Sequence, residues 1–366
     1  MNILFIGTLS EPVTGQSLAC QVFFDELIQT NNVKVIDLGK NTFKQGINSI
    51  SRIINVLKII YNIWKNKEDK DVIYFTISQS YAGNIKDILI YLVCYRQLST
   101  MIIHLHGGAG MRNIMSEKNK ILRWLNTFFL NKMGAIIILG NRHADIYAGI
   151  SDQRKIYIVP NFAQDYLFTN TTTIQYKFEN PKPLKILFLS NLLPGKGHIE
   201  LVQAFISLDE IAKAAVEIYF AGGFESKEQE LSFLNMIAGF EQLRYHGKVE
   251  AEQKKKLFSA AHVFCLPTYY PYEGQPISIL EAYASGCAVI TTDHSGIYDV
   301  FTDGVNGFGV SKKSYLSLKY AIEKAIESPT LLRNFAMNNL NAAKNNYTTD
   351  NYNSNLMTII NSVSSS

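Results

Sequence analysis

Cysteine is scarce in this chain of 366 residues, and its spacing argues against two kinds of structural support. There are four cysteines, and no two of them form a C-x-x-C pair. This spacing favours neither a zinc site nor a disulfide framework, so we expect a protein of the reducing cytoplasm. The four are Cys20, Cys94, Cys265 and Cys287.

Long apolar runs are also missing. The longest candidate, residues 88–95, is too short to cross a bilayer. The sequence after Met1 is strand-like at once, with neither a basic leader nor a cleavage site, so we expect no signal peptide.

Charged residues make up only 18% of the chain and hydrophobic residues 47%, which is typical of a globular protein rather than a disordered one. The length suits two domains of about 150–200 residues each. Residues 1–180 carry a formal charge of +6 and residues 181–366 a charge of −2. The basic first half could face an acidic partner, such as anionic lipid or a phosphorylated substrate, or it could be an ordinary solvated surface.

Short β-rich runs alternate with helical patterns along the whole chain. Apolar strands separated by helices predict parallel sheets covered on both faces, and the pattern starts afresh after the polar segment 166–183. We therefore expect two Rossmann-like α/β domains, residues 1–165 and 184–347, joined by that segment as a linker. A helix within residues 348–366 follows and could pack back on the first domain. Strands are expected at residues 3–7, 33–38, 72–77, 101–104, 135–139, 156–159, 184–190, 216–220, 243–246, 262–266 and 288–291. Helices are expected near 16–29, 47–66, 84–98, 116–132, 143–149, 199–205 and 350–363.

Ligands of such domains usually lie at the carboxyl ends of the strands, and two segments of the first half fall there. Gly15 opens a helix after the first strand, where it could let backbone amides approach a phosphate or could form an ordinary turn. His104 and His106 lie two residues apart at a strand end, hence on one face. We expect His106 to contact the ligand and His104 to be structural. A satisfied core histidine and a metal site are the alternatives, and no further metal ligand lies nearby in sequence.

Lys196 stands between two glycines where a helix begins after the first strand of the second half. The spacing is not that of a P-loop. A cation at a helix N-terminus is nevertheless well placed for a diphosphate, because it adds to the positive end of the helix dipole. The alternative is a solvated lysine in a tight turn.

Glu273 and Glu281 lie eight residues apart, and Glu281 belongs to a run that is otherwise apolar or small. A carboxylate in such a run is costly to bury unless it is hydrogen-bonded. Glu273 precedes the run on a loop between Tyr272 and Gly274. Two acids at one helix N-terminus indicate a pocket for a ligand rich in hydroxyl groups.

The spacing of Glu273 and Glu281 resembles the E-x7-E signature of the retaining glycosyltransferases of family 4. The resemblance covers most of the second half. It is looser in the first half, where it rests on Gly15, His106 and Val159-Pro160-Asn161. The other matching segments are Ser190-Asn191-Leu192 with Lys196-Gly197, Tyr219-Phe220-Ala221-Gly222-Gly223, His246-Gly247-Lys248-Val249, Leu266-Pro267, Gly286, Gly296 and Asp303-Gly304-Val305-Asn306-Gly307.

This resemblance implies a GT-B fold, in which two Rossmann-like domains with mainly parallel sheets face each other across a cleft. The second domain would hold a nucleotide-sugar donor and the first the acceptor. As catalytic residues, Glu273 would touch the donor sugar, Lys196 would neutralise the leaving diphosphate, and His106 would stand beside the reacting sugar. Glu281 would bind the ribose hydroxyls. The remaining donor-binding positions would be Gly274, Gln275, Ile277, Asn191, Gly15, Gly247 and Val249, with the base near the last two.

Two positions depart from the family pattern. Asn191 stands where an arginine is common, so one phosphate cation is missing or comes from elsewhere. Ser295-Gly296-Ile297-Tyr298-Asp299 replaces the usual Gly-Gly-Ile-Pro-Glu, which affects the expected contacts to the donor sugar. Asp69-Lys70-Asp71 spells D-x-D, a metal motif of another glycosyltransferase fold, but its highly charged surroundings favour a solvated loop.

The sequence thus predicts a metal-independent hexosyltransferase acting in surface polysaccharide synthesis. Its substrates would be a UDP- or GDP-linked sugar and a glycan, and we expect no cofactor, no metal and no nucleic-acid partner. A nucleotide-sugar epimerase of the same fold and a non-catalytic sugar-nucleotide binding protein are the alternatives. A dinucleotide oxidoreductase is poorly supported, because no G-x-G-x-x-G follows a strand.

Two basic, aromatic helical stretches, residues 47–66 and 118–132, bear on the acceptor. Ordinary core packing explains most such stripes. The alternative is peripheral docking to an anionic membrane, at the inner face of the plasma membrane, which would suit a lipid-linked acceptor.

Overall fold

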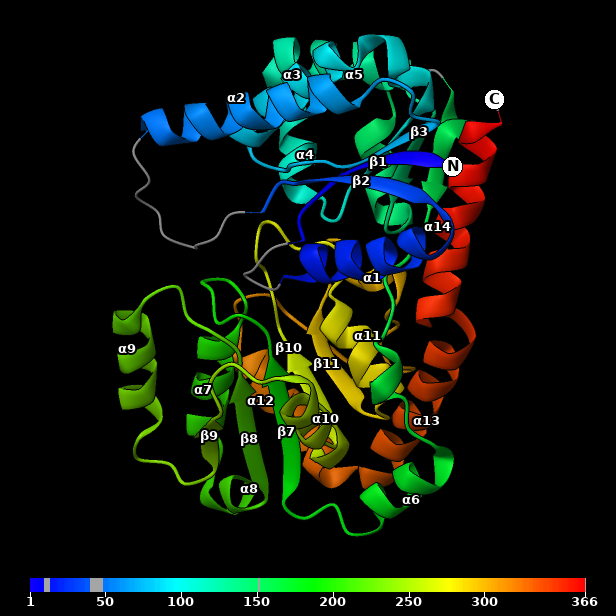
Figure 1. Cartoon of the computed structure of the whole chain (residues 1–366). Helices are drawn as coiled ribbons and strands as arrows, with labels where there is room; N and C mark the ends of the chain where they lie inside the picture. The colour runs from blue at the N-terminus through cyan, green and yellow to red at the C-terminus, as the bar shows by residue number, and fades with distance from the viewer. Residues whose placement is uncertain (10–13, 40–48, 151, 366) are drawn as a thin grey trace. The chain divides into compact units, whose positions relative to one another are not determined.

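Two compact units make up the chain in the computed structural model, which describes residues 1–9, 14–39, 49–150 and 152–365. Unit 1 combines residues 1–161 with residues 350–366, and unit 2 is the continuous stretch 162–349. The chain therefore leaves unit 1 once and later returns to it (Figure 1).

Unit 1 is built on a six-stranded sheet in which all neighbouring strands are parallel. The strand order is β2-β1-β3-β4-β5-β6. The central strands are short, rich in isoleucine and buried along their length, as parallel strands covered by helices must be. The bounds are β1 (Asn2–Gly7), β2 (Asn32–Asp37), β3 (Val72–Thr76), β4 (Met101–His104), β5 (Ala135–Ile138) and β6 (Ile156–Ile158).

Helices cover both faces of this sheet: α2, α3 and α5 lie side by side on one face, and α1 lies on the other (Figure 1). The expected helix 84–98 begins earlier because Ser80 caps it, its Oγ accepting from the Gly83 N–H at 3.1 Å. The expected helix 143–149 is a 3₁₀ helix. Positions 47 and 48 of the expected helix 47–66 lie outside the described residues. The bounds are α1 (Gly15–Thr30), α2 (Ser49–Asn66), α3 (Tyr81–Val93), η1 (Tyr95–Thr100), α4 (Ala109–Ile114), η2 (Glu117–Asn119), α5 (Lys120–Leu130), η3 (Asn141–Tyr147) and η4 (Gln153–Lys155).

Unit 2 repeats the architecture with a parallel sheet of order β12-β11-β10-β7-β8-β9. The α/β prediction with two parallel sheets is confirmed. The sequence did not predict β12, because this strand is only four residues long and two of them are glycines. Gly307 opens it where a β-carbon would come within 1.7 Å of the Val289 carbonyl oxygen. The bounds are β7 (Leu184–Leu189), β8 (Val216–Ala221), β9 (Leu243–Tyr245), β10 (Val263–Leu266), β11 (Ala288–Thr292) and β12 (Gly307–Val310).

The helices of unit 2 follow the strands in regular alternation. They end with α12 and α13, and α13 packs against α11 and α6. The bounds are η5 (Asp165–Leu167), α6 (Thr171–Glu179), α7 (His198–Ile206), α8 (Glu210–Ala214), α9 (Lys227–Ile237), α10 (Ala251–Ala260), α11 (Ile277–Ala284), η6 (Ile297–Asp299), α12 (Tyr315–Glu327) and α13 (Pro329–Asn346).

The segment 166–183, expected as a linker, is instead part of unit 2. Its apolar residues Ile174 and Phe178, four positions apart, are buried in the core of that unit on one side of α6. Lys177 on the same helix is half-buried, and its Nζ donates to the carbonyls of Ser285 at 2.8 Å and Gly286 at 3.2 Å. The polar composition of the segment conceals these contacts, which explains the difference.

Helix α14 (Thr349–Ser364) follows unit 2 and packs in unit 1. The Tyr352 ring lies 6.5 Å from the Phe23 ring and 6.4 Å from the His104 ring, between centroids. A β-carbon on Gly134 would come within 2.7 Å of Val363, so the helix lies directly against this turn. Unit 1 is therefore completed by residues distant in sequence from the rest of it.

Candidate active site

The strand order of unit 2 reverses between β7 and β10, and the loops that leave these two strands meet there. In open parallel sheets such a reversal creates a crevice for ligands beyond the carboxyl ends of the strands. Residues 190–197 follow β7, and residues 267–276 follow β10. The Tyr269 N–H donates to the Gly195 carbonyl at 2.7 Å, so the two loops are joined through their backbones.

Two glycines permit this close approach. Gly195 and Gly197 have φ angles of +92° and +90°, in the left-handed region that favours glycine. A β-carbon on Gly197 would lie 2.6 Å from the Pro267 carbonyl oxygen. The glycines that flank Lys196 therefore shape the loop and bring it against the strand β10 loop.

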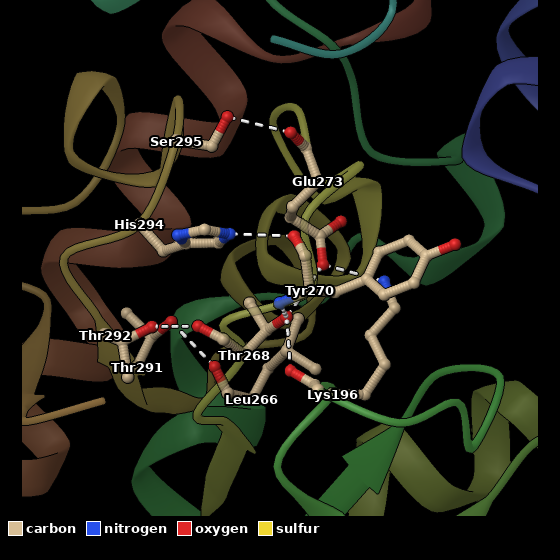
Figure 2. A network of polar contacts seen from close by, with 10 residues as sticks. Lys196, Leu266, Thr268, Tyr270, Glu273, Thr291, Thr292, His294 and Ser295 are labelled. Carbon is tan, nitrogen blue, oxygen red and sulfur yellow. Dashed lines mark hydrogen bonds and ion pairs between the residues drawn. The ribbon is translucent and has the colours of Figure 1, made fainter. Parts of the chain in front are cut away.

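Lys196 and Glu273 form an ion pair at this junction. The Nζ of Lys196 donates to Oε2 of Glu273 at 2.7 Å, and the two side chains are only 12% and 9% exposed (Figure 2). The Thr268 hydroxyl donates to the same carboxylate oxygen at 3.0 Å. The Tyr270 ring lies 4.8 Å from the Lys196 ammonium, within the range of a cation–π contact. The structure thus brings together two residues that the sequence analysis singled out separately.

A third loop, which follows β11, forms hydrogen bonds with the backbone of the Glu273 loop (Figure 2). The Ser295 hydroxyl donates to the Glu273 carbonyl at 2.8 Å, and the Gly296 N–H donates to the Gly274 carbonyl at 3.0 Å. His294 contacts the Tyr270 carbonyl through Nε2 at 2.8 Å. The segment that departs from the family pattern therefore fixes the position of the Glu273 loop.

Helix α11 begins directly after this loop. Gly274, Gln275 and Ile277 are buried at its start, and Pro276 stands at the N-cap. The first amides of a helix have no carbonyl partner within it, and the helix dipole makes this end positive. An anion is therefore favoured beside Lys196 and Glu273.

Glu281 lies one turn into α11 and is 1% exposed. Its Oε1 accepts from Lys254 Nζ on α10 at 2.5 Å, and the same ammonium contacts Oε1 of Gln164 at 3.0 Å. Burial raises the pKa of the Glu281 carboxyl above its usual value, and the Lys254 charge opposes that rise. The buried carboxylate is thus partnered, as the cost of burying it requires.

Asn191, Gly247 and Val249 belong to a neighbouring set of loops in unit 2. The Gly222 N–H donates to the Gly247 carbonyl at 2.8 Å, and the Leu192 N–H beside Asn191 donates to the Gly223 carbonyl at 2.8 Å. Gly247 has a φ of +67°, and no atom of the described residues lies within 4 Å of the position that a β-carbon would take. The β8 loop therefore connects the Asn191 segment to the Gly247 segment.

His106 lies in unit 1, directly after β4, and stacks on His104 with ring centroids 3.9 Å apart. Burial lowers the pKa of His106 to about 3, so the ring is neutral at physiological pH. Among the described residues, neither of its ring nitrogens has a hydrogen-bond partner. His104 is fully buried, and its Nδ1 lies 2.6 Å from the Tyr74 hydroxyl. His106 therefore keeps a free donor and a free acceptor, whereas one nitrogen of His104 is used within the core.

Gly15 lies at the start of α1, in unit 1, and is exposed. Thr14 caps the helix, its hydroxyl accepting from the Ser17 N–H at 3.1 Å. Among the described residues, no atom lies within 4 Å of the position that a β-carbon on Gly15 would take. Positions 10–13 of the loop before it lie outside the described residues.

The sequence analysis missed several site residues because they contact the predicted ones only through the fold. Thr268 and Tyr270 lie in the strand β10 loop, but nothing in their spacing marks them. Lys254 belongs to a run of three lysines that looks like a solvated helix face. A buried Glu281 does require a cation, and that requirement was the available signal.

The described residues also bear on the expected metal, D-x-D and membrane properties. No group of three His, Cys, Asp or Glu side chains suited to a metal ion occurs in the part of the chain that the structure describes. In the D-x-D segment, Asp69 is exposed, and the Asp71 carboxylate accepts from the Asn2 N–H at 2.7 Å. Among the described helices, none is both long enough and apolar enough to cross a bilayer.

Comparison with known proteins defines the class. Residues 170–342 match the model of the family described as glycosyl transferases group 1. An uncharacterized glycosyltransferase of Methanocaldococcus jannaschii is 24% identical over 341 residues, which are 87% of this chain and 82% of that protein. The N,N'-diacetylbacillosaminyl-diphospho-undecaprenol alpha-1,3-N-acetylgalactosaminyltransferase of Campylobacter jejuni is 28% identical over 43% of this chain and 39% of its own length.

Among solved structures, Anabaena HepE in complex with UDP superimposes with a TM-score of 0.73 at 17% identity, covering 99% of this chain and all of that one. The two parallel α/β units thus form a GT-B fold, and the fold expected from the resemblance is confirmed. Within unit 2, the chain is similar to the group 1 glycosyl transferases, and over most of its length it is similar to a glycosyltransferase.

Proposed function

We propose that the protein transfers a hexose-type sugar from a nucleoside-diphosphate donor to a glycan acceptor, with retention of configuration and without a metal ion. The Lys196–Glu273 pair carries this proposal. It lies at the reversal point of the unit 2 sheet, between two loops and at the start of α11. A cation, a carboxylate and a helix N-terminus together match a sugar diphosphate, which has both anionic and hydroxyl groups.

Each donor group has a matching residue. Glu281 would accept hydrogen bonds from the two ribose hydroxyls, and Glu273 would accept one from the sugar. Lys196 and the amides at Gly274, Gln275 and Ile277 would hold the phosphates. The open backbone at Gly247, with Val249 beside it, would face the base, and Asn191 would be a neutral neighbour of the phosphates where an arginine is common. Gly15 would bring a further backbone amide to the donor.

The proposed reaction follows from the negative charge that develops on the leaving diphosphate. The bond from sugar C1 to the phosphate oxygen breaks as an acceptor hydroxyl bonds to C1 on the same face. The hydroxyl proton passes to the released diphosphate. Negative charge therefore grows on the diphosphate, where Lys196 and the start of α11 stabilise it most strongly in the transition state. This preorganised charge replaces the role a divalent cation plays elsewhere.

His106 suits a contact to a sugar hydroxyl. Its ring is neutral and can accept at one nitrogen and donate at the other. A neutral donor and acceptor can orient a hydroxyl without adding charge near C1. We therefore assign it to the reacting sugar.

The acceptor is proposed to be a lipid-linked glycan of surface polysaccharide synthesis, and the donor a UDP- or GDP-sugar. The name of the Campylobacter relative describes transfer onto a diphospho-undecaprenol acceptor, and HepE has been solved with UDP and with UDP-glucose. These likenesses support the choice of both substrates.

Calorimetric titration with UDP and with GDP would identify the nucleotide, and transfer assays with the matching sugars would follow. Binding of one nucleotide together with sugar transfer to a glycan would support the proposal. Conversion of the donor to an epimer without acceptor, or binding without any turnover, would contradict it.

A further inference from the structure

Unit 1 exposes large apolar side chains along three neighbouring helices. On α2 they recur every three or four residues, and on α3 and α5 they do the same, so each helix carries one apolar stripe on its solvent side. The α2 stripe is Ile53, Ile54, Leu57, Tyr61 and Trp64, from 46% to 59% exposed. The α3 stripe, continued by η1, is Tyr81, Ile85, Leu89, Leu92 and Tyr95, and the α5 stripe is Ile121, Trp124 and Phe128. We call these residues together the three-helix face.

The two tryptophans of the chain both lie on this face. Trp64 is 59% exposed and Trp124 is 65% exposed. Tryptophan has a large apolar surface and is highly buried on average, so two exposed tryptophans on one layer of helices are unusual for a surface that meets only water. Extended exposed apolar patches mark interaction sites.

The exposed charges on the same three helices have one sign. Outside the stripes, α2 carries Lys58 and Lys65 exposed, and α5 carries Lys120 exposed. Arg123 on α5 has 43% of its side chain exposed and lies 3.7 Å from the exposed carboxylate of Glu117, which precedes this helix. The three helices contain one acidic residue, Asp87, which is fully buried and paired with Lys86 at 2.8 Å. The described part of α2, α3 and α5 therefore offers cations and aromatic rings to solvent, and no exposed carboxylate.

The face is held together before any partner arrives. Asn84 on α3 and Asn126 on α5 exchange two hydrogen bonds of 2.9 Å in a buried position. Rings of Trp124, Phe128 and Tyr95 follow one another with centroid distances of 6.1 Å and 6.4 Å. Lys132 lies over the Phe128 ring at 5.0 Å. The aromatic groups of α3, η1 and α5 thus form a preformed surface.

The positive charge of the three-helix face distinguishes between two partners, a second copy of the chain and a lipid bilayer. A second copy of the chain would place one cationic face against another, which opposes association. An anionic lipid bilayer matches both properties, because tryptophan and tyrosine favour the interface while lysine and arginine stems lie along apolar surface and reach the headgroups. Figure 1 shows α2, α3 and α5 as a layer on one side of the unit 1 sheet, so one plane can meet all three.

We infer that the three-helix face docks unit 1 on an anionic lipid surface, with Trp64 and Trp124 at the level of the headgroups. The inference gives the proposed lipid-linked acceptor a defined site of approach and extends that proposal. The composition and exposure of the three-helix face support docking whatever the donor is. The docking that we infer is peripheral.

Intrinsic fluorescence tests this directly, since both tryptophans belong to the face. Vesicles of phosphatidylglycerol mixed with phosphatidylcholine should shift the emission to the blue, and vesicles of phosphatidylcholine alone should give little shift. Trp64→Phe and Trp124→Phe each leave a single reporter, and both reporters should respond. Lipids brominated near the headgroups should quench each of them.

Vesicle sedimentation then measures the contribution of charge. Lys58→Gln with Lys65→Gln should weaken partitioning about 30-fold, since each cation contributes about 1 kcal/mol near an anionic surface. Lys255→Gln with Lys256→Gln is the matched control, because both lysines are exposed on α10 of unit 2 and the change in charge is the same. This control should partition as the wild type does.

The outcomes separate this inference from the proposed function. The variant with Lys58→Gln and Lys65→Gln should keep donor turnover with a water-soluble acceptor. It should lose turnover with an acceptor embedded in vesicles. If the wild-type protein bound anionic vesicles but turned over no donor with either acceptor, the enzyme assignment would be overturned and the docking inference would stand. Unshifted fluorescence with anionic vesicles would overturn the docking inference, as would a dimer in sedimentation that Trp124→Glu dissociates.

Discussion

Lys196 and Glu273 lie 77 positions apart in sequence, yet the Nζ of one is 2.7 Å from the Oε2 of the other. The pair neutralises itself in the crevice where we place the donor. A diphosphate must therefore compete with Glu273 for the ammonium, and Glu273 is then free to accept from a sugar hydroxyl. One ion pair thus accounts for two donor contacts.

Replacing Lys196 tests this exchange. Lys196→Ala should lower kcat about 10²- to 10³-fold, the usual effect of losing one preorganised group that stabilises transition-state charge. Steady-state kinetics with the identified donor measures it. Lys196→Arg is the control, because it keeps the charge and should retain more activity. Wild-type kcat in the alanine variant would contradict the role.

Glu281 should act on donor affinity. Glu281→Gln removes the charged acceptor for the ribose, and a hydrogen bond to a charged group contributes about 1.5–3 kcal/mol, so the donor KM should rise about 10- to 100-fold. The same variant should change kcat little. A donor lacking the ribose 2'-hydroxyl should be discriminated against by the wild type and less so by Glu281→Gln. Equal discrimination by both proteins would contradict the assignment.

Lys254 should determine how the stability depends on pH through its contact with Glu281. Burial already raises the pKa of Glu281, and Lys254→Met would remove the charge that opposes the rise. A carboxyl with a raised pKa in the folded state binds its proton more readily than in the unfolded state, so stability falls as the pH rises toward the folded pKa. Urea unfolding should therefore show Lys254→Met losing about 3–5 kcal/mol near neutral pH and less in acid. A deficit that does not vary with pH would contradict the coupling. Lys255→Met, on the same helix, is the matched control.

His262 should make unit 2 sensitive to acid. Burial, and then the Lys177 charge, lower the pKa of His262 to about 4. Its Nδ1 accepts a hydrogen bond from the Lys185 N–H at 2.9 Å, and a ring protonated at Nδ1 could not accept this bond. Below about pH 6.5 the unfolded state binds a proton that the folded state does not, so stability falls as the pH decreases toward the folded value. The loss from this group should reach about 3 kcal/mol near pH 4. Urea unfolding across this range should show a smaller slope for His262→Gln, and an identical slope would contradict the prediction.

Gly197 and Gly247 allow a matched pair of substitutions. Both have positive φ, so an alanine costs about 1–2 kcal/mol at either position. Gly197→Ala also places a β-carbon 2.6 Å from the Pro267 carbonyl oxygen, whereas the space at Gly247 is open. Gly197→Ala should therefore be clearly less stable and should lose activity through displacement of Lys196. Equal thermal stability of the two variants would contradict the argument.

The sequence could predict the units and the loops, because both depend on local patterns. Apolar strands alternating with helices predicted the two parallel sheets, and Lys196 between glycines lay where a loop follows a strand. The pairing of Lys196 with Glu273 was not predictable, since it depends on β10 lying next to β7. The same holds for Lys254, which reaches Glu281 from another helix.

Segment 166–183 shows that a local pattern can also give a wrong prediction. Its composition is that of a linker, yet two buried apolar residues and one lysine, hydrogen-bonded to backbone carbonyls, hold it in unit 2. Composition averages over a segment, whereas packing depends on a few positions. Short runs such as β12 escape prediction for a similar reason, because four residues carry too little periodicity.

The return of α14 to unit 1 has a consequence for biosynthesis. Translation completes residues 1–161 first, then all of unit 2, and only afterwards the helix that carries Tyr352, Leu356 and Ile360. Until that helix leaves the ribosome, the surface of unit 1 around Phe23 and Gly134 stays uncovered. The nascent first unit must therefore wait for the second to be made before its own core can close.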